Sequence, residues 1–180
     1  MSLALVIGGT KSGKSEHAER LARATGLAVR YVATADGSDP AMQARIRTHR
    51  ARRPAGWTTM EAGPSLSDAL LDAADVCVLI DGLGPWIATW LDTAGAFESP
   101  DRDVLERVAE DVLADVERVA MGAEGAGAAI VVAEQAGEGM LPPDPVSRAW
   151  LDMLGEATQR LAAGAQSVEL VVAGRALRMG

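Results

Sequence analysis

The chain opens with an apolar run, residues 3–7, which leads directly into a G-x-x-x-x-G-K-S motif and then into a helix-forming sequence. The motif residues are Gly8, Gly9, Thr10, Lys11, Ser12, Gly13, Lys14 and Ser15. Glycine lets the backbone turn tightly and approach phosphate oxygens, and the N-terminus of the following helix favours anions. Lys14 is placed to reach the β- and γ-phosphates, and the Ser15 hydroxyl to bind Mg²⁺. The order of strand, loop and helix predicts that the chain binds a nucleoside triphosphate.

Length and charge limit the classes of protein that remain. The 180 residues predict one catalytic domain, covering 1–180. The formal net charge of −8 argues against a general nucleic-acid binder, which would neutralise phosphates with a basic surface. No apolar run approaches the ~18 residues of a membrane span, and a signal peptide is not expected. Cys77, the single cysteine, lies in an apolar run, so we expect it in the core of a cytoplasmic protein.

Apolar runs that alternate with helical patterns predict the fold class. The runs expected to form strands are 3–7, 28–33, 76–80, 128–133 and 168–173, with 57–61 as a candidate edge strand. Most lack in-out alternation, as expected for strands buried on both faces. Residues 101–121 and 146–162 carry apolar side chains at helical spacing. This alternation predicts an α/β fold, a P-loop NTPase-like three-layer sandwich with a mostly parallel central sheet.

Two segments beyond the loop carry candidate site features. The run Val-Leu-Ile-Asp ends in Asp81, and we expect its strand to lie beside the first strand, with Asp81 holding Mg²⁺ directly or through water. The alternative is an ordinary aspartate at a strand end. Residues 134–145 form a long loop after a strand, at the edge where open α/β sheets build their sites.

An arginine cluster stands out in this acidic chain. Residues 45–53 contain five arginines, with His49 among them. The cluster fits a polyphosphate, because like charges at this spacing repel one another without an anion. Neighbouring guanidinium charge favours a neutral imidazole, the form that attacks phosphorus, although a surface role for His49 stays open. His17 follows the phosphate-binding loop on the first helix, and we expect it to be structural.

Together these segments resemble one enzyme family. They comprise the loop, Tyr-Val-Ala-Thr-Ala at 31–35, His-Arg-Ala-Arg-Arg-Pro at 49–54, Trp57, Thr58, Glu61, Val-Leu-Ile-Asp at 78–81, and a tail from 137 to 162. The combination resembles the bifunctional adenosylcobinamide kinase/adenosylcobinamide-phosphate guanylyltransferase of cobalamin assembly, nearly end to end.

The resemblance implies a two-stage enzyme. A nucleoside triphosphate, ATP or GTP, phosphorylates the aminopropanol hydroxyl of adenosylcobinamide, and GMP from GTP is then transferred to that phosphate through a guanylylated histidine, here His49. The catalytic residues are then His49 and Lys14, and the metal residues Ser15 and Asp81. The resemblance adds to the loop, as nucleotide-binding residues, Ala33, Thr34, Ala35, Arg50, Ala51, Arg52, Arg53, Glu61 and Asp81. It also implies a corrinoid substrate, Mg²⁺ and a symmetric homo-oligomer, for which a trimer is one option. Trp86 and Trp90 are candidate contacts between subunits, with packing in the core as the alternative.

Two departures from the family pattern concern the kinase step more than the guanylyl transfer. Glu134-Gln135 stands where the family reads Asn-Glu, and Gly82-Leu83-Gly84-Pro85-Trp86 where it reads Cys-Leu-Thr-x-Trp. The second departure removes a hydroxyl near the expected metal. Both are also compatible with drift that the enzyme tolerates.

The positions of the lysines decide against one other class of nucleotide-binding protein. A switch GTPase recognises guanine with an Asn/Thr-Lys-x-Asp loop, and the only lysines are Lys11 and Lys14, so that class is excluded. A P-loop small-molecule kinase in which His49 forms no covalent intermediate stays open.

Overall fold

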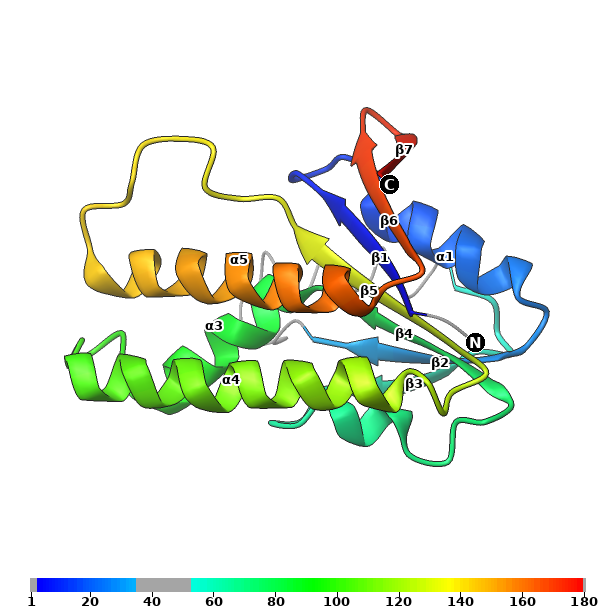
Figure 1. Cartoon of the computed structure of the whole chain (residues 1–180), viewed down its shortest axis with the longest axis horizontal. Coiled ribbons are helices and arrows are strands. Elements are labelled where there is room, and N and C mark those ends of the chain that lie inside the picture. The colour runs from blue at the N-terminus through cyan, green and yellow to red at the C-terminus, as the bar shows by residue number, and fades with distance from the viewer. Residues whose placement is uncertain (1–2, 35–52, 180) are drawn as a thin grey trace.

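The computed structural model describes residues 3–34 and 53–179, and these form a mostly parallel sheet covered by helices (Figure 1). In chain order the elements are β1 (Leu3–Gly8), α1 (Lys14–Ala24), β2 (Ala28–Ala33), β3 (Thr58–Glu61), the 3₁₀ helix η1 (Ser67–Leu70), β4 (Val76–Asp81), α3 (Leu83–Thr93), α4 (Arg102–Gly122), β5 (Ala128–Glu134), α5 (Pro145–Gly164), β6 (Ser167–Val172) and β7 (Arg175–Met179). The strand order is β3-β2-β4-β5-β1-β6-β7. Only β7 runs antiparallel to its neighbour among these described strands.

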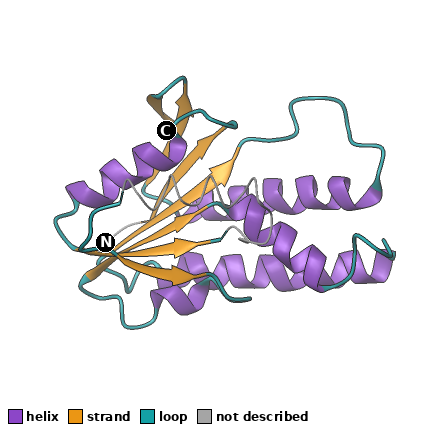
Figure 2. Cartoon of the chain, turned by 180° about the vertical axis from the view of Figure 1, so that it is seen from behind, coloured by secondary structure: helices purple, strands orange, loops and turns teal. Residues whose placement is uncertain are grey.

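The sheet has an apolar cluster on each of its two faces, and helices cover both. One apolar cluster joins α1 to the sheet through residues such as Ala18, Ala22 and Leu79, and a larger one joins the opposite face to α3, α4 and α5. Figures 1 and 2 show α1 on one side of the sheet and the other three helices on the opposite side. In β5 every residue before Glu134 is buried, as expected for a strand covered on both faces. The predicted three-layer α/β sandwich is confirmed, and Cys77 is a fully buried core residue.

Helices α4 and α5 form where the apolar spacing predicts them. Asp101 caps α4 by accepting a hydrogen bond from the Asp103 N–H, and Asp144 caps α5 by accepting one from the Ser147 N–H. Each helix then turns one apolar stripe to the core. The buried stripe residues are Val108, Val112, Val116 and Val119 in α4, and Met153, Leu154, Ala157 and Leu161 in α5. The capped starts and the single stripes explain why both helices lie along one face of the sheet.

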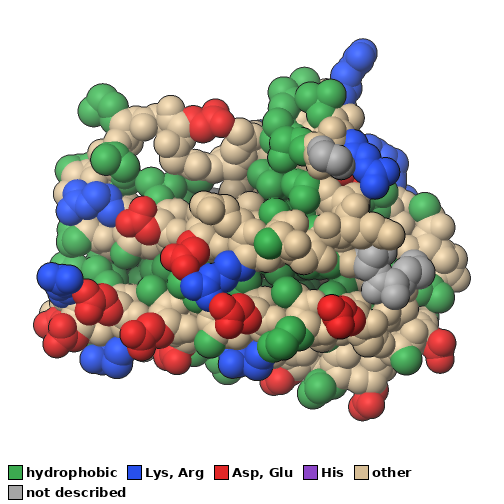
Figure 3. All heavy atoms as spheres, in the orientation of Figure 1, with side chains coloured by type: hydrophobic (Ala, Val, Ile, Leu, Met, Phe, Trp, Pro, Cys, Tyr) green, Lys and Arg blue, Asp and Glu red, His purple; other side chains and the backbone are tan. Residues whose placement is uncertain are grey.

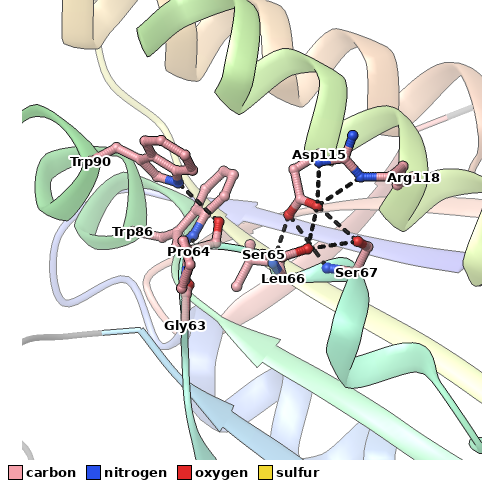
Figure 4. A network of polar contacts seen from close by, with 9 residues as sticks. All are labelled: Gly63, Pro64, Ser65, Leu66, Ser67, Trp86, Trp90, Asp115 and Arg118. Carbon is pink, nitrogen blue, oxygen red and sulfur yellow. Dashed lines mark hydrogen bonds and ion pairs between the residues drawn. The ribbon is translucent and has the colours of Figure 1, made fainter. Parts of the chain in front are cut away.

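A buried carboxylate anchors the loop that follows β3 (Figure 4). Asp115 of α4 is 1% exposed, and its oxygens accept hydrogen bonds from the N–H groups of Leu66 and Ser67 and from the hydroxyls of Ser65 and Ser67. Arg118 donates to the same carboxylate from the solvent side. The loop that leads away from Glu61 is therefore fixed to the helical layer.

The two tryptophans of α3 fasten the same loop. Trp86 donates from Nε1 to the carbonyl of Gly63 at 3.3 Å, and Trp90 donates to the carbonyl of Pro64 at 3.1 Å. Trp86 is 2% exposed and Trp90 is partly buried. Core packing is thus the role of Trp86, and the alternative of an exposed contact is wrong for this residue.

The sheet differs from the sequence prediction at β7 and in strand order. The exposed strand β7 was not predicted. It pairs with β6 through a turn at Ala173 and Gly174, both of which have positive φ. The candidate edge strand at 57–61 is confirmed as β3, parallel to β2. Strand β4 was expected beside β1, and this is wrong because β5 lies between them.

The face formed by α4 and α5 carries acidic and basic side chains side by side (Figure 3). Arg160 of α5, for example, pairs with Glu156 on its own helix and with Glu117 on α4. Among the residues described here, no helix is long and apolar enough to cross a membrane.

Candidate nucleotide and magnesium site

The phosphate-binding loop has the backbone geometry that its glycines predict. Gly13 has φ +93°, and a Cβ at Gly8 would lie 2.8 Å from the carbonyl oxygen of Val171. Helix α1 begins at Lys14 without a side-chain cap. Its first N–H groups have no partners within the helix, so they are available to an anion. The loop is also held from behind, because the Gly174 N–H at the β6–β7 turn donates to the carbonyl of Ser12 at 2.8 Å.

Two polar side chains of the loop, Lys14 and Ser12, are buried. Lys14 is 4% exposed, and its Nζ donates to the carbonyl of Gly9 at 3.3 Å. The Ser12 hydroxyl is buried and has no hydrogen-bond partner within the described structure. Lys14 does not face solvent, because the loop folds around its side chain. A phosphate group would supply acceptors to both side chains, so the cradle fits a polyphosphate.

Asp81, at the carboxyl end of β4, receives three hydrogen bonds that position it. The Ser15 hydroxyl donates to Oδ1 at 2.8 Å, and the Tyr31 hydroxyl donates to Oδ2. The Thr34 hydroxyl donates to the backbone carbonyl of Asp81 at 2.8 Å. Burial, followed by the nearby Asp81 carboxylate, raises the pKa of Tyr31 well above its usual range, so Tyr31 remains a donor. The carboxylate is thus directed at the start of α1, although one strand separates β4 from β1.

Glu134 ends β5, the strand that lies between the loop and Asp81. Its Oε2 accepts a hydrogen bond from the Gly84 N–H at 2.7 Å, at the start of α3. Burial raises its pKa, although this hydrogen bond and the charge of Lys14 act in the opposite direction. Glu134 therefore lies close enough to Lys14 for the two charges to interact.

Glu134 and Gly84 depend on each other. A Cβ at position 84 would lie 2.7 Å from Oε2 of Glu134 and 2.8 Å from Cζ2 of Trp150, whose Nε1 donates to the Gly84 carbonyl. A larger residue at 84 and a glutamate at 134 would therefore compete for one space. Gly84 and Glu134 belong to the two departures from the family pattern, and the structure brings them into contact at this point.

Arg53 and Glu61 lie at the same edge of the sheet. The guanidinium carbon of Arg53 lies 3.3 Å from the centroid of the Tyr31 ring, and its Nε is buried without a hydrogen-bond partner in the described structure. Glu61 ends β3 opposite Ala33 in the strand register, and Ala33 in turn lies opposite Asp81. The carboxyl ends of β2, β3 and β4 thus bring these candidate residues to one edge.

Sequence comparison identifies the enzyme family. The chain matches the family model "Cobinamide kinase / cobinamide phosphate guanyltransferase" over residues 4–179. The chain belongs to this family. The bifunctional adenosylcobalamin biosynthesis protein CobP of Pseudomonas aeruginosa is 38% identical over 172 residues, which cover 94% of this chain and 92% of that protein. The proteins named CobU of Escherichia coli K12 and Salmonella typhimurium are 33% and 34% identical, over 94% of this chain and 95% of each. The family resemblance predicted from the motifs is confirmed.

Solved structures give a more distant likeness. The assembled ATPase EscN of the enteropathogenic E. coli type III secretion system is similar, with a TM-score of 0.49 and 11% identity, over 96% of this chain and 43% of that one. The flagellar accessory protein FlaH of Methanocaldococcus jannaschii has a TM-score of 0.44 and 13% identity, over 97% of this chain and 74% of its own. The fold assignment rests on the strand order and layers described above.

Several residues expected in the site of this cobinamide kinase/guanyltransferase lie outside the described residues: Ala35, His49, Arg50, Ala51 and Arg52. The described residues on either side of that segment, Thr34 and Arg53, are both at the Asp81 edge. His17 lies on α1, and its Nε2 is 2.6 Å from a carboxylate oxygen of Glu169 on β6. This contact agrees with the structural role expected for His17.

The donor set of the site fits Mg²⁺. Ser15 and Asp81 offer a hydroxyl and a carboxylate, which are hard oxygen ligands. Within the described ranges, no group of three or more His, Cys, Asp or Glu side chains could hold a metal ion by itself. Mg²⁺ sites in kinases commonly use one or two protein oxygens together with substrate phosphates. The residues present would therefore hold the ion together with a bound nucleotide.

Two residues of the site have no role assigned from the sequence. Tyr31, which donates to Asp81, stood out only as the first residue of the segment 31–35, and Glu134 only as a departure from the family pattern. The position of Tyr31, two residues before the end of a buried strand, is the signal that could have indicated it.

Proposed function

We propose that this enzyme phosphorylates adenosylcobinamide with a nucleoside triphosphate and then transfers GMP from GTP to the product, giving adenosylcobinamide-GDP. The observation that carries the proposal is the phosphate-binding loop in a chain of the cobinamide kinase/guanyltransferase family, with Ser15 and Asp81 in contact across the sheet edge. Both reactions use a nucleoside triphosphate, so both need a site that binds a polyphosphate.

For the kinase step, the substrate hydroxyl oxygen attacks the γ-phosphorus, and the bond from that phosphorus to the β,γ-bridging oxygen breaks. The nucleoside diphosphate leaves, and the hydroxyl proton is released to solvent or to a base. The loop N–H groups and Lys14 hold the phosphates and stabilise the charge on the leaving group. Mg²⁺, held by Ser15 and Asp81, would neutralise phosphate charge when bound.

For the transferase step, a neutral imidazole nitrogen of His49 attacks the α-phosphorus of GTP and pyrophosphate leaves. A phosphate oxygen of adenosylcobinamide phosphate then attacks the same phosphorus, and the bond to His49 breaks. Arginine is suited to hold the triphosphate during both displacements, because its guanidinium can bind phosphate oxygens in a bidentate manner. Arg50, Arg52 and Arg53 are the residues proposed for this role.

The remaining nucleotide contacts are assigned on the same grounds. Ala33 and Thr34 lie at the carboxyl end of β2 and Glu61 at that of β3. Ala35 and Ala51 are assigned from the family resemblance alone, and Glu61 would bind the guanine edge or the ribose. We also propose that the enzyme is cytoplasmic and forms a homo-oligomer in which each chain is a single catalytic domain. The phosphoryl donor for the corrinoid is ATP or GTP.

The decisive experiment is to incubate the protein with α-³²P-GTP and Mg²⁺ and to count label retained after denaturation. A guanylyl-histidine is a phosphoramidate, so the label should be stable in base, labile in acid and absent from His49→Asn. His17→Gln, which changes the other of the two histidines, should retain the label. If the wild type forms no adduct yet phosphorylates adenosylcobinamide, the P-loop kinase without a covalent step is the correct function.

A further inference from the structure

We infer that Tyr31 is a positioning residue for the carboxylate that holds the catalytic Mg²⁺, so that it sets the affinity of the enzyme for the metal–nucleotide complex. The inference rests on the proposed role of Asp81. It concerns a side chain that belongs to neither the phosphate-binding loop nor the arginine cluster.

The strand register brings the phenol to the carboxylate. Tyr31 lies opposite Leu79 in the parallel pair β2–β4, and Asp81 is two residues beyond Leu79. Residues two apart on a strand point to the same face of the sheet. Tyr31 and Leu79 both belong to the apolar cluster beneath α1. The carboxylate of Asp81 therefore faces the helix that begins with Lys14 and Ser15, and the phenol reaches along the same face to meet it.

The two carboxylate oxygens of Asp81 have different donors. Ser15 donates to Oδ1 from α1, and Tyr31 donates to Oδ2 from the neighbouring strand. With Oδ2 bound to the phenol, the rotation of the carboxylate is fixed and Oδ1 stays directed at the loop. Residues that fix the orientation of a metal ligand typically contribute about 10- to 100-fold to metal affinity.

The phenol itself is held rigidly. Tyr31 is 2% exposed, and the guanidinium of Arg53 lies over its ring at 3.3 Å. A cation over the face of the ring withdraws electron density, which makes the hydroxyl a stronger donor to a carboxylate. Removal of the hydroxyl alone leaves the ring and its contact with Arg53 in place, so Tyr31→Phe isolates the hydrogen bond.

The test measures equilibrium binding of a fluorescent GTP analogue as Mg²⁺ is varied, in the wild type, Tyr31→Phe, Asp81→Asn and Val29→Ala. Val29 is buried on the same face of β2, so its truncation controls for a general loss of packing. We expect Tyr31→Phe to raise the half-saturating Mg²⁺ concentration by about 10- to 100-fold, while binding of the metal-free nucleotide is unchanged. Val29→Ala should bind Mg²⁺ with the nucleotide as the wild type does.

A second readout needs no catalysis and no nucleotide. Tyr31 is the single tyrosine of the chain, so tyrosine labelled with ¹³C at Cζ gives one NMR signal. That signal should move in Asp81→Asn and should stay in place in Val29→Ala, apart from small packing shifts. An unmoved signal in Asp81→Asn would mean that the phenol does not bind the carboxylate, and the inference would be wrong.

The outcomes separate this inference from the proposed function. If Asp81→Asn weakens Mg²⁺-dependent binding and Tyr31→Phe does not, the inference is wrong and the metal role of Asp81 stands. If the wild type binds the nucleotide with no dependence on Mg²⁺, or Asp81→Asn equals the wild type, the proposed metal site is wrong and the inference falls with it.

Discussion

The Ser15 hydroxyl lies 2.8 Å from Oδ1 of Asp81, although the strands that lead to these two residues are not neighbours. Strand β5 lies between β1 and β4, and its last residue, Glu134, pairs with Gly8 at the start of the phosphate-binding loop. Asp81, Glu134 and Ser15 therefore follow the order of β4, β5 and β1 along this edge of the sheet, Ser15 lying on the helix after the loop. The charge of Lys14 acts on Glu134 in the middle of this row. This arrangement makes separate predictions for Lys14 and for Glu134.

Lys14→Met should remove nucleotide chemistry while the fold remains intact. The loss of one charge-stabilising group typically costs about 10²–10³ in rate, so both activities should fall by at least about that factor. The free energy of unfolding should be unchanged or higher, because burial of a cation costs desolvation free energy and methionine fills a similar volume. Steady-state kinetics and urea unfolding measure the two effects. Arg20→Ala, which removes an exposed cation from the same helix, is the control, and turnover by Lys14→Met close to that of the wild type would contradict the assignment.

Glu134→Gln should stabilise the protein near neutral pH. Burial raises the pKa of Glu134 in the folded state, so the folded state binds this proton more tightly than the unfolded chain does. As the pH rises above about 4.3, the unfolded chain ionises first, and the free energy of unfolding falls until the folded group has ionised as well. Glutamine keeps an acceptor for the Gly84 N–H and has no such ionisation.

The advantage of Glu134→Gln should therefore shrink as the pH falls and vanish about one pH unit below the usual glutamate pKa of about 4.3, where Glu134 is protonated in both the folded and the unfolded wild type. Urea unfolding across a pH series measures it. A difference between the two proteins that stays constant with pH, or a loss of stability in Glu134→Gln at neutral pH, would show that the charge of Glu134 is well solvated or well paired in the fold.

Much of the fold could be predicted because the decisive signals are local. The glycines of the loop fix its geometry within a few residues, and strands buried on both faces appear as continuous apolar runs, as in 128–133. Strand β7 was missed because it is an exposed five-residue edge strand that begins with Arg175 and has Arg178 between its apolar residues. The turn before it needs positive φ at Ala173, which the sequence does not signal.

The site was predicted less completely because several of its contacts depend on strand order and register. The place of β5 between β1 and β4 follows from the crossovers, and no motif specifies it. The contact of Tyr31 with Asp81 needs Tyr31 to lie opposite Leu79. Likewise, the paired requirement of Gly84 and Glu134 joins residues that are far apart in the sequence, so each alone was interpreted as a departure from the family.

The final prediction concerns the anchor of the loop after β3. Asp115→Ala would leave the buried N–H of Leu66 and that of Ser67 without their acceptor, and each unsatisfied group costs about 1–3 kcal/mol. We therefore expect a loss of about 3 kcal/mol in the free energy of unfolding. Asp115→Asn should cost less, because its amide oxygen can face the two N–H groups while its NH₂ donates to the hydroxyls of Ser65 and Ser67, which can rotate to accept.

Arg118→Ala is the matched control, because it removes the solvent-facing partner of the same carboxylate. The Arg118 side chain is 54% exposed, and Asp115 keeps its four other hydrogen bonds without it, so this variant should be the least destabilised of the three. Urea unfolding of the three variants should thus rank them, from most to least destabilised, as Asp115→Ala, Asp115→Asn and Arg118→Ala. If Asp115→Ala is no less stable than Arg118→Ala, the loop N–H groups find other acceptors, and the anchor is not what fixes the segment that leads away from Glu61.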